Sequence, residues 1–148
     1  FLRDSASKEL SGPETIAVFE RSVMNTAKEL TAMGKTVIYI GAAASPDVDV
    51  PQVLALSAFN GTTQPLVINK ERNMARNKPA DAIFKKAAAT YKHVHYVPIM
   101  DVFFENGGSL TRDGVPLFND YSHVTTRAAS LILAPEIEAR LKKSMRKH

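Results

Sequence analysis

Two short apolar runs, rich in β-branched residues, limit what this chain can fold into. Residues 36–40 read TVIYI and residues 93–99 read HVHYVPI. The first run is typical of a strand buried on both faces, as in a parallel sheet. Parallel strands need a long crossover connection, and the segment between the runs carries helical patterns. The sequence therefore predicts an α/β fold with both runs as parallel strands of one sheet.

Helical patterns surround the two strands. Residues 11–14 read SGPE, the form of a capping box, and apolar residues then recur at three- and four-residue steps to residue 33. Gly34 is placed to end this helix. We expect the helix to pack on the sheet. Further helices are predicted over 52–59, over 69–91 and from about 125 into the tail. Pro79 is expected to break or kink the second of these, and Pro135 predicts a break or restart in the last.

Composition sets wider limits. The chain has 148 residues, 45% hydrophobic and 23% charged, which is enough for one domain with a core. No apolar run approaches the ~20 residues of a membrane span. The chain contains no cysteine, which excludes disulfides and thiol chemistry. Without repeats, low-complexity tracts or linkers, residues 1–148 are expected to form a single domain or part of one.

The basic excess of the chain is partly local. The net charge is +4, and five cations crowd the C-terminus: Arg140, Lys142, Lys143, Arg146 and Lys147. Cations suit the negative end of a helix dipole, so a solvated helix end explains them. Aromatic residues, which would stack on bases, are not interleaved with these charges. Nucleic acid is therefore not expected as a partner.

The motif with most chemical content is NDYSH, residues 119–123, in which Asp120 and His123 lie three positions apart. A neutral histidine is a useful base near neutral pH, provided that its tautomer and ring orientation are fixed. A carboxylate bonded to the second ring nitrogen supplies both. We therefore treat Asp120 and His123 as candidate catalytic residues. A surface histidine near a helix start is the simpler alternative.

Other titratable residues of the chain have simpler explanations. Asp101, Asp120 and His123 offer ligand types that suit divalent ions, but no second histidine lies at ligand spacing, so no metal site is expected. Asp101 follows a strand and is expected to bond loop backbone. His93 and His95 alternate with an apolar residue, which predicts a shared face at a solvent-exposed strand edge.

A longer stretch around the motif resembles the last block of SGNH hydrolases, most closely the SGNH domain fused behind acyltransferase family 3 membrane proteins. The similarity is carried by Asp101-Val102, Asp113-Gly114, Pro116-Leu117-Phe118 and the Asp-x-x-His spacing. Residues 30–55, LTAMGKTVIYIGAAASPDVDVPQVLA, are also similar to an upstream segment of the family. In all, the resemblance covers residues 14 to 138. It implies a three-layer, flavodoxin-like α/β sandwich.

The chain departs from the family in three places. Val124-Thr125 replaces the usual Leu-Ser, and the loop after Asp101 lacks the two cysteines often found there. The Gly-Asp-Ser block with the nucleophile is missing. Asp4-Ser5 matches only the last two residues of that block, and we do not expect Ser5 to be the nucleophile. Residues 1–3 resemble instead the end of a strand, so the chain is expected to be the C-terminal part of the domain.

The resemblance also implies a function. A serine upstream of this chain would carry an acetyl group to, or remove it from, cell-surface carbohydrate, with His123 as base and Asp120 as its partner. The implied partners are an acyl donor, a saccharide acceptor and a membrane acyltransferase domain upstream in the same polypeptide, in a periplasmic or other extracytoplasmic location. That chemistry requires no cofactor. The alternative is a non-catalytic domain that binds carbohydrate or a partner through a degenerate site.

Overall fold

Two parallel strands lie at the centre of the molecule. In the computed structural model, which describes residues 2, 4–6, 11–61 and 67–146, β1 (Val37–Ile40) pairs with β2 (Val94–Val97), and Val37 lies opposite Val94. This confirms the predicted parallel pairing. Apart from Leu2, the strand end expected at residues 1–3 lies outside the described residues.

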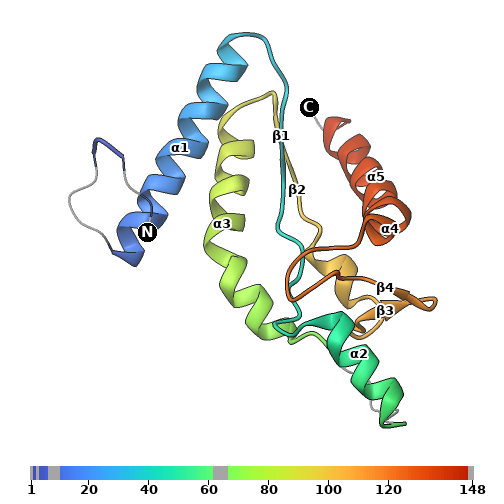
Figure 1. Ribbon diagram of the computed structural model, residues 1–148. Coiled ribbons are helices and arrows are strands. Elements are labelled where there is room, and N and C mark those ends of the chain that lie inside the picture. The colour runs from blue at the N-terminus through green and yellow to red at the C-terminus, as the bar shows by residue number, and fades with distance from the viewer. Residues whose placement is uncertain (1, 3, 7–10, 62–66, 147–148) are drawn as a thin grey trace.

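The remaining elements follow one another along the chain as the sequence predicts in outline (Figure 1). A short hairpin and a 3₁₀ turn separate β2 from the last helical region. The bounds are α1 Gly12–Ala32, α2 Val50–Phe59, α3 Lys70–Thr90, η1 Met100–Phe104, β3 Thr111–Arg112, β4 Val115–Pro116, α4 Thr126–Ala128, the π-helical turn η2 Ala129–Leu133 and α5 Ala134–Met145.

Helices α1 and α3 cover one face of the sheet. The Ser11 hydroxyl caps α1 by accepting from the Glu14 amide, and α1 ends before Gly34, whose φ is 73°. Tyr39 of β1 stacks on Phe84 of α3, with 4.9 Å between ring centroids. The buried members of this cluster are Val23, Ala27, Val37, Ile83, Ala87 and Val94. The expected packing of the first helix on the sheet is thus confirmed.

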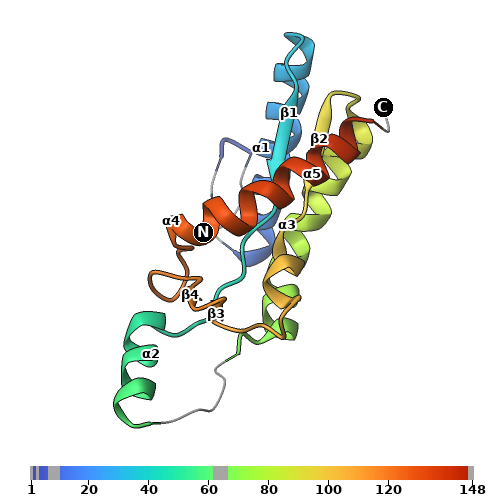
Figure 2. The ribbon, with the colours of Figure 1, turned by 90° about the vertical axis from the view of Figure 1, so that its right-hand side faces the viewer.

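Helix α5 lies on the opposite face, which gives three layers (Figures 1 and 2). Successive side chains of a strand point to opposite faces. Val94 accordingly joins the α1–α3 cluster, while His95 lies under α5, with its Nδ1 3.0 Å from the Ser144 hydroxyl. His95 is only 5% exposed. The predicted solvent-exposed edge is therefore wrong for His95, because α5 packs over this part of β2.

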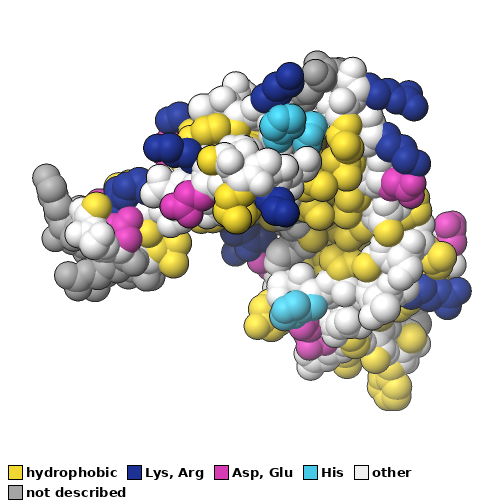
Figure 3. All heavy atoms as spheres, turned by 90° about the horizontal axis from the view of Figure 1, so that it is seen from above, with side chains coloured by type: hydrophobic (Ala, Val, Ile, Leu, Met, Phe, Trp, Pro, Cys, Tyr) yellow, Lys and Arg dark blue, Asp and Glu magenta, His cyan; other side chains and the backbone are white. Residues whose placement is uncertain are grey.

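Strand β1 is buried on one face only. Ile38 is 42% exposed and Ile40 is 47% exposed, because α5 packs on β2 and leaves the same face of β1 open. Burial on both faces, expected from the TVIYI run, is therefore wrong. From above, hydrophobic side chains gather in a hollow of the molecular surface (Figure 3).

The two prolines predicted to interrupt helices have different outcomes. Helix α3 runs through Pro79 without a break in its assignment. The carbonyl that loses its amide partner belongs to Ala75, an exposed residue, so water can replace the lost bond. Pro135 instead follows the wide π-helical turn η2, and α5 restarts with Pro135 in its first turn. The predicted restart is confirmed there.

A second hydrophobic cluster lies beyond the C-terminal ends of the strands. Fully buried Phe118 packs against Phe103 of η1, with 5.4 Å between ring centroids. The β3–β4 hairpin borders this cluster and turns through Asp113 and Gly114, both of which have positive φ, as a two-residue hairpin loop requires. This cluster supports the segment that holds Asp120 and His123.

Candidate functional site

The segment from Leu117 to Thr125 forms a closed loop. The Thr125 amide donates to the Leu117 carbonyl at 2.9 Å, and the Asn119 amide donates to the His123 carbonyl at 2.7 Å. Phe118 anchors the loop in the second cluster. The Thr125 side chain accepts from the Ala128 amide and so caps α4. The loop geometry therefore comes from backbone bonds at its base and from the helix start that follows.

Asp120 binds His123 at both backbone and side chain. One carboxylate oxygen, Oδ1, accepts from the amides of Ser122 and His123, each at 2.7 Å. The other, Oδ2, lies 2.7 Å from Nδ1 of His123. The hydrogen bond expected from the Asp-x-x-His spacing is thus present. The catalytic role of the two residues remains a prediction.

The same bonds settle the charge state of the carboxylate. The amide of His123, then that of Ser122, then the His123 ring lower the pKa of Asp120 to about 2. An ionised carboxylate can only accept, so Nδ1 of His123 carries the proton in the neutral ring. The other ring nitrogen, Nε2, is left as an acceptor.

His123 presents this acceptor to solvent. Its side chain is 75% exposed, and within the described part of the chain its ring forms hydrogen bonds only through Nδ1. The Ser122 hydroxyl, 3.4 Å from Nδ1, is on the wrong side of the ring to be activated. The ring is therefore held in one orientation with an acceptor nitrogen facing outward, a geometry that suits a hydroxyl or water brought from elsewhere.

A network that sequence reasoning missed joins this loop to the loop that follows β1. The Ser45 hydroxyl donates to the Tyr121 carbonyl at 2.8 Å. The Ser45 backbone is held in turn by fully buried Asn73 of α3, whose amide group accepts from the Ser45 N–H at 2.7 Å and donates to its carbonyl at 2.9 Å. The network places the Asp120 loop beside the end of the sheet, where sites of parallel α/β folds form.

The other candidate residues lie apart from this pair. Ser5 is exposed, and its neighbour Asp4 is held by two bonds from Arg21 of α1. Asp101 binds Arg140 of α5 at 2.6 Å, which is the main cause of its lowered pKa. The described ranges contain no group of three or more His, Asp or Glu side chains placed to hold a metal.

Comparison with known families matches residues 3–139 to the SGNH domain that is fused to AT3 domains. The chain belongs to this family. No curated protein and no solved structure matches it. The match spans β1 and β2, the Asp120 loop and the first half of α5.

Membership in the family of SGNH domains fused to AT3 domains connects this chain with acyl-group chemistry and with a membrane acyltransferase domain. Across the parts of this SGNH domain that the structure describes, every helix is too short or too polar to cross a bilayer. The Asp120–His123 pair is the feature of the structure that fits acyl transfer, since such chemistry needs an oriented base.

Proposed function

We propose that this SGNH domain carries two members of a Ser-His-Asp site, the base His123 and the orienting carboxylate Asp120. The site would transfer O-acetyl groups to cell-surface carbohydrate or hydrolyse them from it. The observation that carries the proposal is the 2.7 Å bond between Asp120 and Nδ1 of His123, which leaves Nε2 free and exposed. The nucleophilic serine is proposed to come from a segment outside these 148 residues.

Each step uses Nε2 of His123. The ring takes the proton of the serine hydroxyl as its oxygen attacks the acyl carbonyl, and it returns that proton to the leaving group. An acceptor hydroxyl or water then gives its proton to Nε2 as its oxygen attacks the acyl-serine, and Nε2 returns that proton to the serine oxygen as the acyl–serine bond breaks. Asp120 holds the tautomer and stabilises the imidazolium. This sequence of steps balances without a metal or organic cofactor.

The proposal extends to location and partners. The AT3 domain of the same polypeptide would pass acyl groups to the serine, and the SGNH domain would meet its carbohydrate on the extracytoplasmic side of the membrane. Support for this comes from the family description, which couples the two domains.

The test compares the 148-residue chain with a longer polypeptide that includes the upstream serine, in hydrolysis of a simple acetyl ester. We expect activity only in the longer polypeptide. In it, His123→Ala should abolish turnover, and Asp120→Asn should lower the rate by about 10⁴-fold if the tautomer role carries over from protease triads.

Three results would count against parts of this mechanism. Turnover by the short chain that survives His123→Ala would exclude His123 as the base. An inactive longer polypeptide that still binds saccharide would favour the alternative, a carbohydrate-binding domain with a degenerate site. Turnover by the short chain that needs both His123 and Ser5 would restore Ser5 as the nucleophile.

A further inference from the structure

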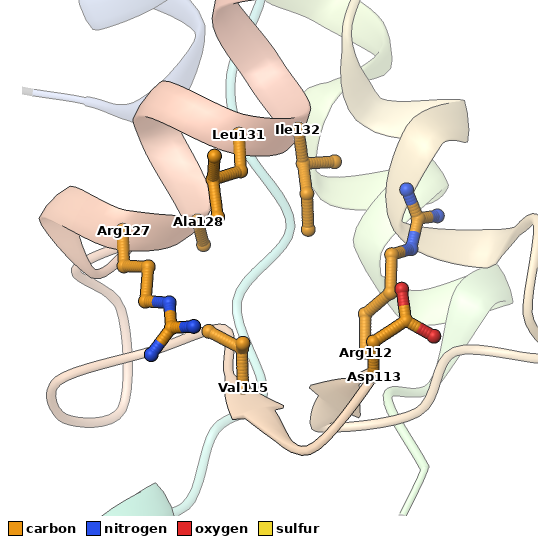
Figure 4. A pocket seen from close by; sticks show the side chains of 7 residues that line it. All are labelled: Arg112, Asp113, Val115, Arg127, Ala128, Leu131 and Ile132. Carbon is orange, nitrogen blue, oxygen red and sulfur yellow. The ribbon is translucent and has the colours of Figure 1, made fainter.

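A pocket of about 400 Å³ lies between the β3–β4 hairpin and the last helical region (Figure 4). This volume is near the lower end of the range for small-molecule sites, about 300–1,000 Å³. It suits a ligand of one or two rings. The lining residues are Arg112, Asp113, Val115, Arg127, Ala128, Leu131 and Ile132.

Two opposite charges face this pocket from different elements. Arg127 of α4 and Asp113 of the hairpin turn stand on opposite sides of it (Figure 4). Neither side chain has a hydrogen bond or ion pair with any residue that the structure describes. Arg112 differs, because its guanidinium already binds the Val102 carbonyl and Glu105. The polar groups without a partner are thus the Arg127 cation, the Asp113 anion and the buried Nε–H of Arg112.

Apolar side chains form the wall between these charges. Leu131 and Ile132 belong to the π-helical turn η2, and Val115 belongs to β4 (Figure 4). Leu131 is 62% exposed although it is large and apolar. Short π-helical turns occur frequently at functional sites. The wall offers a surface for C–H groups, while the charged groups at its sides offer a donor and an acceptor.

The pocket is also close to His123 along the chain. Arg127 follows His123 by four positions, so their Cα atoms are at most about 14 Å apart. The intervening Thr125 is fixed to the hairpin, because its hydroxyl donates to the Pro116 carbonyl at 2.9 Å. The pocket and the His123 loop are therefore held together by this hydrogen bond.

We propose that this pocket is the subsite for the carbohydrate acceptor; the inference rests on the proposed function. A neutral sugar ring presents hydroxyls that accept from Arg127 and donate to Asp113, and its C–H groups contact Leu131, Ile132 and Val115. A simple anion fits less well, because Asp113 repels it. A zwitterion satisfies both charges but uses the apolar wall less.

The experiment follows amide chemical shifts of the 148-residue chain by NMR during titration with N-acetylglucosamine, maltose, inorganic phosphate or glycylglycine. We expect the saccharides to shift the amides of Gly114, Val115 and Leu131. Arg127→Ala and Asp113→Asn should each weaken this binding at least tenfold. Asparagine tolerates positive φ, so the second change leaves the turn intact. Arg146→Ala removes an exposed cation outside the pocket and should have no effect.

Three outcomes would overturn the inference: saccharides that shift none of these amides, phosphate that binds more tightly than the saccharides, or preferential binding of glycylglycine. The binding assay needs no nucleophile, so it separates this inference from the proposed chemistry. If the longer polypeptide binds saccharide but shows no turnover that depends on His123, the subsite is supported and the acyl-transfer proposal is excluded. If turnover depends on His123 but Arg127→Ala leaves the acceptor KM unchanged, acyl transfer is supported and the subsite is excluded.

Discussion

Among the groups that bind the Asp120 carboxylate, two are backbone amides. Those of His123 and Ser122 contribute more to its low pKa than the imidazole does. The carboxylate is therefore ionised and positioned by the turn itself, before any interaction with the ring. In the proposed mechanism, this arrangement would keep Asp120 in place while His123 gains and loses a proton.

The first residue-scale prediction concerns titration of this carboxylate. Asp120 should titrate with a pKa near 2 instead of the usual value near 4. Because the folded pKa is lowered, its stabilising contribution is present above about pH 4 and is lost as the pH falls towards 2. His123→Ala should raise the pKa only part of the way, since both amides remain. Carboxyl carbon shifts measured by NMR against pH provide the test, and a wild-type midpoint near 4 would contradict it.

The second prediction concerns Asn73, whose side chain is fully buried and binds both polar backbone groups of Ser45. Asn73→Ala leaves these groups without partners and should lower the free energy of unfolding by about 1–3 kcal/mol. Ser45→Ala, the matched control, removes only the bond to the Tyr121 carbonyl and should cost less. Urea unfolding of both variants measures the difference. Equal losses would show that Asn73 does not organise this junction.

Sequence spacing predicts the Asp120–His123 bond because three residues of a tight turn bring the two groups together. It could not predict the bonds of Asn73 or the Ser45–Tyr121 contact. These join residues far apart in the chain, and their pairing depends on where the strands place the loops. The same limit applies to Asp101, whose partner Arg140 lies on a distant helix.

At the scale of elements, the sequence predicts the helix ends that are determined by local chemistry. Ser11 and Gly34 mark helix ends that need one hydroxyl or one positive φ. The effect of a proline inside a helix depends on surroundings that the sequence does not display. The chain continues through Pro79 and forms a π-helical turn before Pro135.

An element-scale prediction concerns the end of β1. A Cβ atom added to Gly41 would lie 2.9 Å from the Tyr96 hydroxyl, which Asp81 of α3 holds at 2.6 Å. Because that hydroxyl is tethered, Gly41→Ala should lower the free energy of unfolding by about 1–3 kcal/mol. In a Tyr96→Phe background the same change should cost less. A double-mutant cycle by chemical unfolding measures the coupling, and strictly additive effects would contradict this contact.

At the scale of the whole molecule, the sheet has an open edge. The amides of Val37 and Gly41 donate to β2, so alternation along the strand turns those of Ile38 and Ile40 towards the other edge. The described residues place no strand there.

The α/β class and the parallel pairing followed from the two apolar runs. The partial exposure of β1 could not be predicted in this way, because the composition of a strand does not show which of its faces other elements cover.

The prediction at this scale uses hydrogen exchange. In the 148-residue chain, the amides of Ile38 and Ile40 should exchange much faster than those of Val37 and Gly41. If the longer polypeptide supplies a further strand, the Ile38 and Ile40 amides should become protected in it. Residue-resolved exchange by NMR gives the comparison. Strong protection of all four amides in the short chain would show that another segment already covers this edge.

The pairing of β1 with β2 also has a kinetic consequence. Val37 meets Val94 only after the whole of α2 and α3 has been brought into place, so closing this contact costs chain entropy that no local bond repays. Helices α1 and α3 can form from nearby residues, whereas the strands must wait for each other. During synthesis, β1 leaves the ribosome long before its partner and remains an apolar strand with two unpaired edges. The interval before β2 emerges is therefore the period in which this domain is most exposed to misassembly.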